Sequence, residues 1–305
     1  MPYLTNVTMM DLDFVPEHLV VVGGSYVGLE FAQMFRRFGS RVTVVEMGPR
    51  LVAREDEDVS LEIQRFLAEE GIRLRLHAEC ITVQKESDGL SVGLDCKDGS
   101  PREQGTHLLL AVGRVPNTDD LGLEAAGIKT DKRGYIEVDE TLRTSNPQVW
   151  ALGDCNGKGA FTHTAYNDYE IVADNLLSNA GRKHTDRIPA YALYTDPPLG
   201  RIGLSEKEIR EKGIKALVGK RPMSRVARAV EKGETNGFLK IYVEQGSQRI
   251  LGAALLGVGA DEAVHSILDA VYAGTPYREF QRHVRIHPTV SELLPTVLEN
   301  LSALE

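Results

Sequence analysis

Residues 18–46 hold the residue types and spacing that best suit chemistry. A β-branched apolar run, His18-Leu19-Val20-Val21-Val22, meets the glycine-rich turn Gly23-Gly24-Ser25-Tyr26-Val27-Gly28. Apolar residues at helical spacing follow as far as Gly39, and a second apolar run closes on the acid Glu46. A strand, a turn, a helix and a second strand with a terminal acid are the fingerprint of a dinucleotide-binding unit.

The positions of this turn have physical roles in such a unit. Gly23 permits the tight turn and Gly28 lets the helix pack closely on the strand, whereas Ser25 takes the place of the middle glycine. Backbone N–H groups at the start of the helix would face a diphosphate. Glu46 follows about 20 residues later, where a carboxylate can accept hydrogen bonds from an adenosine ribose.

The charge of Glu46 bears on which dinucleotide is bound. A carboxylate beside the ribose would repel a 2′-phosphate, so the sequence favours NAD over NADP. Arg50 and Arg54 follow closely and would soften that preference.

Composition and charge narrow the choice of partners. The 305 residues suffice for roughly two or three domains of ordinary globular composition. A net charge of -9 argues against nucleic acid. The sequence has no apolar run that could span a bilayer and no N-terminal signal, which predicts a cytoplasmic protein away from membranes. Cys80, Cys96 and Cys155 have neither disulfide nor metal spacing, so no metal site is expected.

The rest of the pattern divides into three parts. A helix from 56–58 to Gly71, a strand at 72–76, a hairpin at 80–95 and a buried strand at 107–112 complete an α/β unit. Strands at 135–138 and 149–152 and a helix around 165–177 have too little core to stand alone. Strands at 238–243 and 250–258, a helix at 259–272 and a last helix at 290–301 indicate an α+β domain, whose wide apolar stripes suggest a subunit interface.

Four motifs in a fixed order match a known family. They are the fingerprint ending at Glu46, residues 111–117 around Gly113, residues 149–154, and residues 287–292. With them the chain resembles the flavin-dependent pyridine nucleotide–disulfide oxidoreductases, the group of dihydrolipoamide dehydrogenase, glutathione reductase and mercuric reductase. The motifs extend across nearly the whole chain.

The resemblance implies roles for individual residues. Asp154 would hydrogen-bond the ribityl chain of a flavin, and Glu30 would point toward the nicotinamide–flavin junction. His287, oriented by Glu292, would be the acid–base that serves the flavin of the partner subunit. The residues alone would favour Asp154 as a turn or capping aspartate, and Thr289 with Glu292 as a capping box. The expected coenzyme-binding residues are Gly23, Gly24, Ser25, Tyr26, Val27, Gly28, Glu30, Glu46, Gly113 and Asp154.

The resemblance also implies an α/β architecture of three parts. Residues 1–118 would form a Rossmann-type NAD-binding domain with an antiparallel insert. Residues 119–183 would be the returning part of an FAD-binding domain, and residues 184–305 a C-terminal α+β dimerisation domain. The sequence contains no second glycine fingerprint and no Cys-x-x-x-x-Cys pair, so the family's first, FAD-binding half is missing from it.

The expected function is therefore that of a portion of a flavoprotein oxidoreductase. In a complete parent, NAD(P)H would pass hydride to FAD, and FAD would reduce a disulfide-type or metal acceptor of small size. This chain would form a homodimer through its C-terminal domain and would lack disulfide reductase turnover. Two alternatives are a non-enzymatic NAD(H)-binding dimer and a complex in which a separate polypeptide supplies the FAD half.

Overall fold

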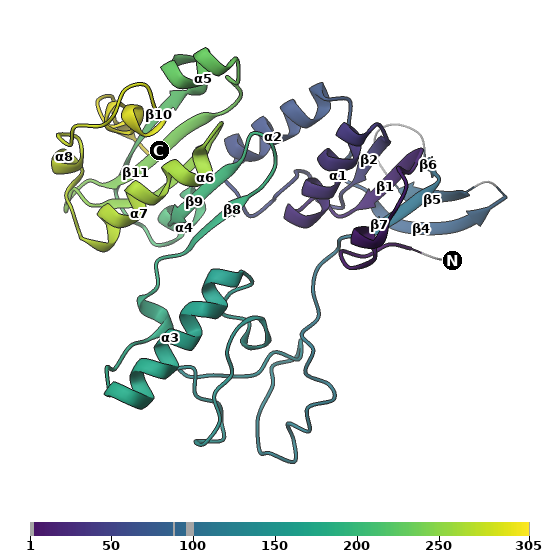
Figure 1. The fold of residues 1–305 in the computed structure, drawn as a ribbon, viewed down its shortest axis with the longest axis horizontal. Coiled ribbons are helices and arrows are strands. Elements are labelled where there is room, and N and C mark those ends of the chain that lie inside the picture. Colours follow the sequence, from purple (N-terminus) through teal and green to yellow (C-terminus); the bar gives the residue numbers. More distant parts are fainter. Residues whose placement is uncertain (1–2, 88, 96–100, 305) are drawn as a thin grey trace. The chain divides into compact units, whose positions relative to one another are not determined.

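The computed structural model describes residues 3–87, 89–95 and 101–304, which fall into two compact units (Figure 1). The first unit comprises Met1–Val112 and Pro189–Glu305, and the second comprises Gly113–Ile188.

A parallel sheet is the centre of the N-terminal part of the first unit. Its order is β3-β2-β1-β7, from β1 (His18–Val22), β2 (Arg41–Val45), β3 (Arg73–Arg75) and β7 (His107–Leu110). All four strands were predicted from their apolar runs. β1 pairs with β2 on one edge and β7 on the other, which agrees with its continuous apolar sequence.

The two faces of this sheet bury different side chains. Leu19 and Val21 share a core cluster with residues of helices α1 (Tyr26–Phe38) and α2 (Glu57–Glu69). Val20 and Val22 belong to another cluster, because successive strand side chains point to opposite faces. Both helices were predicted, and Gly39 ends α1 in the left-handed conformation, at φ 111°.

An antiparallel insert covers the second face of the parallel sheet. It consists of β4 (Glu79–Glu86), β5 (Gly89–Asp95) and β6 (Arg102–Gly105), in that order. Leu90 and Val92 pack with Val20 and Val22. The predicted hairpin is therefore confirmed, while Asp88 of its turn lies outside the described residues.

The C-terminal part of the first unit is built on a six-stranded sheet of order β13-β10-β11-β12-β9-β8. Its strands are β8 (Ala190–Leu193), β9 (Leu199–Gly203), β10 (Ala216–Pro222), β11 (Phe238–Glu244), β12 (Ile250–Leu256) and β13 (Ser302–Ala303). The helices of this part are α4 (Glu206–Glu211), α5 (Ala227–Lys232), α6 (Ala260–Ala263), α7 (His265–Tyr272), α8 (Tyr277–Phe280) and α9 (Leu294–Val297). Leu193, Leu199 and Phe238 enter the core cluster of α1 and α2, so the two parts of this unit share a core.

The expected last helix at 290–301 is wrong in its extent. A 3-10 turn at Ser291–Leu293 precedes α9, which has a proline in its first turn. Pro295 lies in the first turn of α9, where its missing N–H has no intrahelical acceptor to lose, and α9 begins at Leu294 rather than at 290. Beyond Leu298 the chain turns into β13, which pairs with β10. The apolar stripe is nonetheless buried, since Val290, Leu294 and Val297 lie in the C-terminal core.

The second unit has less regular structure than the sequence predicts. α3 (Thr162–Ser178) is the expected helix. The expected strands at 135–138 and 149–152 are wrong, because these segments make only isolated bridges, such as Val138 with Thr144 and Arg143 with Trp150. Their partners are short turn-linked segments, so no ladder extends beyond one residue pair. Among the described residues of the whole chain, no helix is both long and apolar enough to cross a membrane.

Candidate functional site

The glycines of the β1–α1 turn lie where a side chain has no room. Gly23 has φ 113°, and a Cβ on it would lie 2.4 Å from the carbonyl oxygen of Ala111. A Cβ on Gly28 would lie 2.1 Å from the carbonyl oxygen of Gly23 and 3.3 Å from the Cβ of Ala111. Both positions therefore require glycine, as a turn that approaches a diphosphate closely would.

Glu46 lies at the end of β2 and contacts this turn directly. Its Oε2 atom accepts a hydrogen bond of 2.7 Å from the backbone N–H of Gly24. Its Oε1 atom accepts another, also 2.7 Å, from the N–H of Gly48. A carboxylate offers about four acceptor positions, so Glu46 can hold the turn and still accept from ribose hydroxyls.

The start of α1 leaves backbone donors for a ligand. Ser25 is exposed, precedes the helix as its N-cap residue and makes no side-chain cap hydrogen bond. The carbonyl of Ser25 accepts from the N–H of Leu29 at 3.0 Å. The N–H groups of the first helical turn, which includes Tyr26 and Val27, have no intrahelical acceptor and point along the positive end of the helix dipole. This arrangement can bind an anion.

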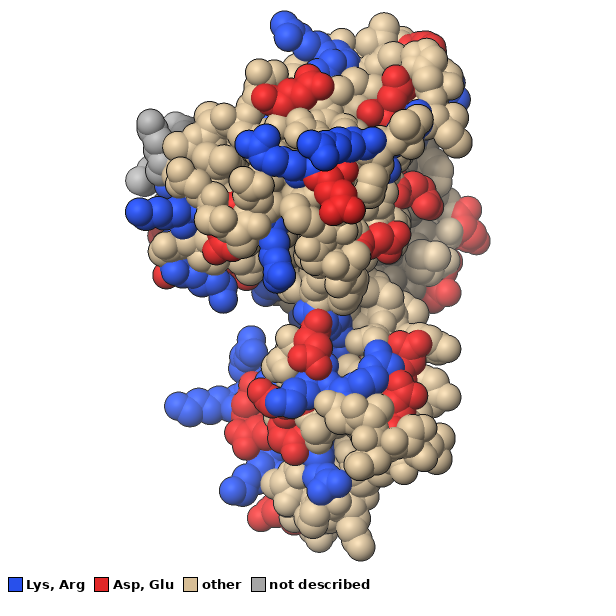
Figure 2. Space-filling model, turned by 90° about the vertical axis from the view of Figure 1, so that its left-hand side faces the viewer, with Lys and Arg blue, Asp and Glu red and all other residues tan. Residues whose placement is uncertain are grey.

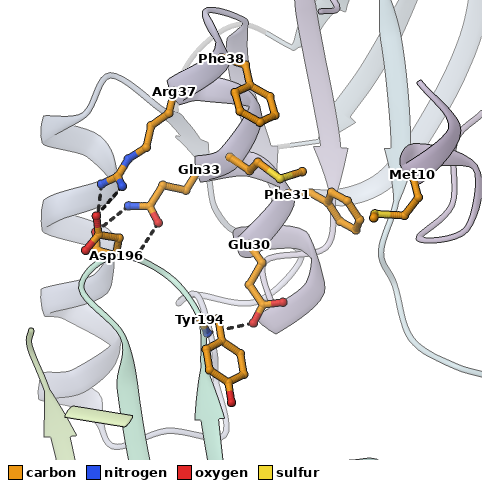
Figure 3. A pocket seen from close by; sticks show the side chains of 9 residues that line it. Met10, Glu30, Phe31, Gln33, Arg37, Phe38, Tyr194 and Asp196 are labelled. Carbon is orange, nitrogen blue, oxygen red and sulfur yellow. Dashed lines mark hydrogen bonds and ion pairs between the residues drawn. The ribbon is translucent and has the colours of Figure 1, made fainter. Parts of the chain in front are cut away.

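Glu30 lies one helical turn further and lines a cavity of about 470 Å³. Figure 3 shows its carboxylate on α1, near Phe31 and opposite Tyr194. Its Oε1 atom accepts from the N–H of Tyr194 at 2.9 Å. Burial raises the pKa of Glu30, and this hydrogen bond opposes the rise. The other lining residues are Met10, Gln33, Met34, Arg37, Phe38 and Asp196.

Asp154 and Gly113 belong to the second unit, not to the unit of the turn. Asp154 begins a short 3-10 helix (Asp154–Asn156), with a side chain that is 56% exposed and an oxygen 3.5 Å from Arg114. The exposed carboxylate can accept hydrogen bonds from hydroxyl groups. Gly113 has φ 134° and no atom within 4 Å of a Cβ built on it. The structure thus requires glycine there for conformation rather than for space.

Asp168 positions Asp154 and was not predicted from the sequence. Its carboxylate, 1% exposed, accepts from the N–H of Gly153 at 2.9 Å and from the amide of Asn156 at 2.8 Å. Arg187 pairs with its other oxygen. A buried carboxylate must be paired, but Asp168 shares the buried side of α3 with Thr164 as well as Ile171, so no local pattern marks it.

His287 and Glu292 lie together in the C-terminal part. Nδ1 of His287 is 2.9 Å from both oxygens of Glu292. The hydrogen bond and the charge of Glu292 raise the pKa of His287. Glu292 also accepts from the N–H of Thr289, at 3.4 Å, and its own N–H donates to the Thr289 hydroxyl at 3.1 Å. The carboxylate therefore serves both arrangements that the sequence left open.

A buried charged cluster connects α2 with the C-terminal sheet. Asp56, expected only as a helix-start acid, accepts from Arg201 at 2.6 Å, from the Tyr242 hydroxyl at 2.8 Å and from the N–H of Glu206 at 2.9 Å. Burial by itself would raise the pKa of Asp56, but the charge of Arg201 and its hydrogen bond outweigh burial and lower that pKa. Lys240 completes the cluster, 3.2 Å from Asp56.

On the face drawn in Figure 2, Lys and Arg side chains lie interspersed with Asp and Glu side chains. Within the described ranges, no three His, Cys, Asp or Glu side chains group as metal ligands. Cys155 is a free thiol, and Cys96 lies outside the described residues.

Comparison with known proteins identifies the family of the chain. Residues 1–168 match the family model of the pyridine nucleotide-disulphide oxidoreductases, and residues 189–298 match the dimerisation domain of the same family. The chain belongs to this family, whose members are flavin-dependent and use NAD(P)H.

Individual relatives resemble the chain over almost its full length. A mercuric reductase of Streptomyces lividans is 35% identical over 99% of this chain and 63% of its own length. A dihydrolipoyl dehydrogenase of Thermus scotoductus is 33% identical over 94% of this chain and 62% of its own. The solved HOCl-induced flavoprotein disulfide reductase RclA of Escherichia coli has a TM-score of 0.89 at 34% identity, covering 96% of this chain and 67% of that one. The chain thus spans about two thirds of the length of these relatives.

Proposed function

We propose that this chain binds NAD(H) at the turn between β1 and α1 and forms the coenzyme side of a flavoprotein oxidoreductase. The observation that carries the proposal is the position of Glu46, 2.7 Å from the N–H of Gly24 in a turn that admits no Cβ at Gly23 or Gly28. In this position the backbone amides would bind the diphosphate and the carboxylate would accept from the adenosine ribose.

The same carboxylate supports NAD rather than NADP as the coenzyme. A 2′-phosphate beside Glu46 would meet a negative charge that already holds two backbone amides. Arg50 would soften this preference, since its guanidinium lies 3.9 Å from the carboxylate of Glu57, beyond hydrogen-bond distance. We therefore expect NADH to bind more tightly than NADPH.

The second unit would hold part of a flavin. Asp154 is an exposed carboxylate fixed through Gly153 by the buried Asp168, and such an acceptor fits the hydroxyl groups of a polyhydroxylated chain such as the ribityl group. Bound flavin supplies the chemistry of accepting hydride and passing electrons on. Residues 119–183 are proposed as the returning part of that flavin domain, between a coenzyme domain at 1–118 and a dimerisation domain at 184–305.

His287 and Glu292 would handle the proton in the complete enzyme. The carboxylate only accepts, so the imidazole donates from Nδ1 and presents Nε2 as the atom that takes up or releases a proton. Val284 and Ile286, beside His287, are 100% and 79% exposed. Such apolar exposure supports a homodimer through this part. The electron acceptor of the complete enzyme would be a small molecule of the disulfide or metal class.

Coenzyme titration tests the proposal. Calorimetry with NADH and NADPH on the wild-type chain should give tighter binding of NADH. Glu46→Gln should narrow the difference between the two coenzymes, because it removes the repulsive charge but keeps an acceptor. Glu69→Gln, an exposed acid of α2 with a side chain that is 59% exposed, is the matched control. Equal affinities for both coenzymes in the wild-type chain would contradict the assignment of Glu46.

Turnover tests the second half of the proposal. The chain alone should not reduce lipoamide or glutathione disulfide with NADH, since its cysteines at 80, 96 and 155 cannot form the redox pair of the family. Reduction by the pure chain would contradict this expectation. A yellow complex formed only on mixing with an FAD-binding polypeptide would show that the flavin half acts in trans.

A further inference from the structure

Three side chains connect the coenzyme turn to the C-terminal sheet. Tyr26, the first residue of α1, donates its hydroxyl to Oε1 of Glu55 at 2.6 Å. Tyr191 of β8 donates its hydroxyl to the same oxygen at 2.7 Å. The two rings lie 5.8 Å apart between centroids. One carboxylate oxygen therefore holds a residue of the turn and a residue of the C-terminal sheet.

The carboxylate between the two tyrosines is firmly placed. Glu55 is 3% exposed, and its Oε2 atom lies 3.5 Å from a guanidinium nitrogen of Arg201, itself 1% exposed. The N–H of Glu55 donates to the carbonyl of Val52 at 2.8 Å. The N–H of Val52 in turn donates to the carbonyl of Gly24, also at 2.8 Å. The segment that carries Glu55 thus contacts the turn at its backbone as well as through Tyr26.

Both hydroxyls remain donors over the accessible pH range. Burial raises the pKa of Tyr26 and that of Tyr191, and the negative charge of Glu55 raises them further. Charge-assisted hydrogen bonds of this kind are about twice as strong as neutral ones. The bridge therefore resists displacement of Tyr26 from its place at the start of α1.

We propose that Tyr191 is a positioning residue for the coenzyme turn: through Glu55 it holds Tyr26, and so keeps the first turn of α1 in the conformation that presents its backbone amides. Coenzyme affinity then depends on a side chain of the C-terminal sheet that belongs to neither the turn nor α1. The effect of Tyr191 on coenzyme affinity rests on the proposed function, whereas its effect on the order of the turn does not.

The test compares two tyrosines of the same sheet. Tyr191→Phe removes only the hydroxyl that reaches Glu55. Tyr242→Phe is the matched control, because Tyr242 is fully buried in the same charged cluster but donates to Asp56, which does not contact the turn. Hydrogen–deuterium exchange without coenzyme reports the order of amides 25–29, and calorimetry reports NADH affinity.

Tyr191→Phe should speed exchange of amides 25–29 and weaken NADH binding by about threefold or more, a part of the roughly tenfold or larger effect of losing a hydrogen bond to a charged group outright. Tyr242→Phe should leave both readouts at the wild-type level even where it lowers the melting temperature. Unchanged exchange in Tyr191→Phe, or an equal change in Tyr242→Phe, would overturn the positioning role. A wild-type chain that fails to bind NADH would overturn the coenzyme site itself, while the exchange comparison would still decide the role of Tyr191.

Discussion

Nδ1 of His287 lies 2.9 Å from each carboxylate oxygen of Glu292, and the same carboxylate closes the turn that begins at Thr289. Capping and orienting a histidine are often considered as alternatives for an acid at this position. Here the turn brings Glu292 back toward His287, so the capping interaction itself places the carboxylate against the imidazole. One geometry thus lets the carboxylate both cap the turn and contact the imidazole.

Replacing Glu292 should change the titration of His287. The hydrogen bond and charge of Glu292 raise the pKa of His287, while His287 lowers the pKa of Glu292. Because the pKa of His287 is raised in the folded chain, the pair stabilises the fold at pH values below the pKa of an unfolded histidine, about 6.5. This stabilisation is lost as the pH rises through the pKa of His287 in the folded chain. In Glu292→Gln, NMR titration of the imidazole should give a lower pKa than in the wild-type chain. Glu299→Gln, an exposed acid nearby, should leave it unchanged.

Replacing Asp56 should destabilise the first unit strongly. Asp56→Asn keeps a good helix N-cap residue but leaves Arg201 buried without its main carboxylate and removes one of the carboxylates that contact the buried Lys240, which keeps Asp58. We expect a loss of about 3 kcal/mol or more in the free energy of unfolding, measured by urea denaturation. Glu57→Gln, the next residue with a side chain that is 75% exposed, should cost under about 1 kcal/mol. Similar losses in the two variants would argue against a buried ion cluster.

Acid should remove the contribution of Asp56 to the free energy of unfolding. Because its folded pKa is lowered, the contribution is present above the unfolded value of about 3.9 and is lost as pH falls through the folded value. The difference in unfolding free energy between the wild-type chain and Asp56→Asn should therefore be constant from pH 7 to about 5 and shrink below about pH 4. A difference that does not change down to the acid transition would count against the assigned shift.

A methyl group at Gly28 should disturb the turn more than the fold. In Gly28→Ala the new Cβ would lie 2.1 Å from the carbonyl oxygen of Gly23, so the turn must move. We expect a cost of about 1–3 kcal/mol in stability and about tenfold or more in NADH affinity, measured by denaturation and calorimetry. Gly246→Ala, where a Cβ meets no atom within 4 Å, is the control. Undiminished NADH binding by Gly28→Ala would contradict close approach at this turn.

The sequence predicts the β1–α1–β2 segment well because each of its signals is local. Four consecutive apolar residues follow His18 in β1, the apolar stripe fits α1, and Gly39 ends the helix in a conformation that glycine favours. Glu46 could be placed as well, since the end of β2 must lie beside the turn when β1 and β2 pair in parallel. Both the fold and the candidate site of this segment can be predicted from the sequence, because both depend on residues that are neighbours along the chain.

The remaining features depend on partners that are distant in sequence. Arg201 reaches Asp56 across 145 positions, and Tyr191 reaches Glu55 across 136. No periodicity marks such pairs, so the sequence indicates Asp56 only as a helix-start residue and assigns no role to Glu55. Likewise the residues after Leu298 pair as a strand with β10 instead of extending the last helix, because tertiary pairing overrides local preference.

The most direct test of the coenzyme site is a crystal structure of the chain grown with NADH. The account predicts the adenosine ribose within hydrogen-bond distance of Glu46 and the diphosphate against the backbone amides of residues 23–28. Coenzyme bound elsewhere, or a turn that remains empty at saturating NADH, would contradict it.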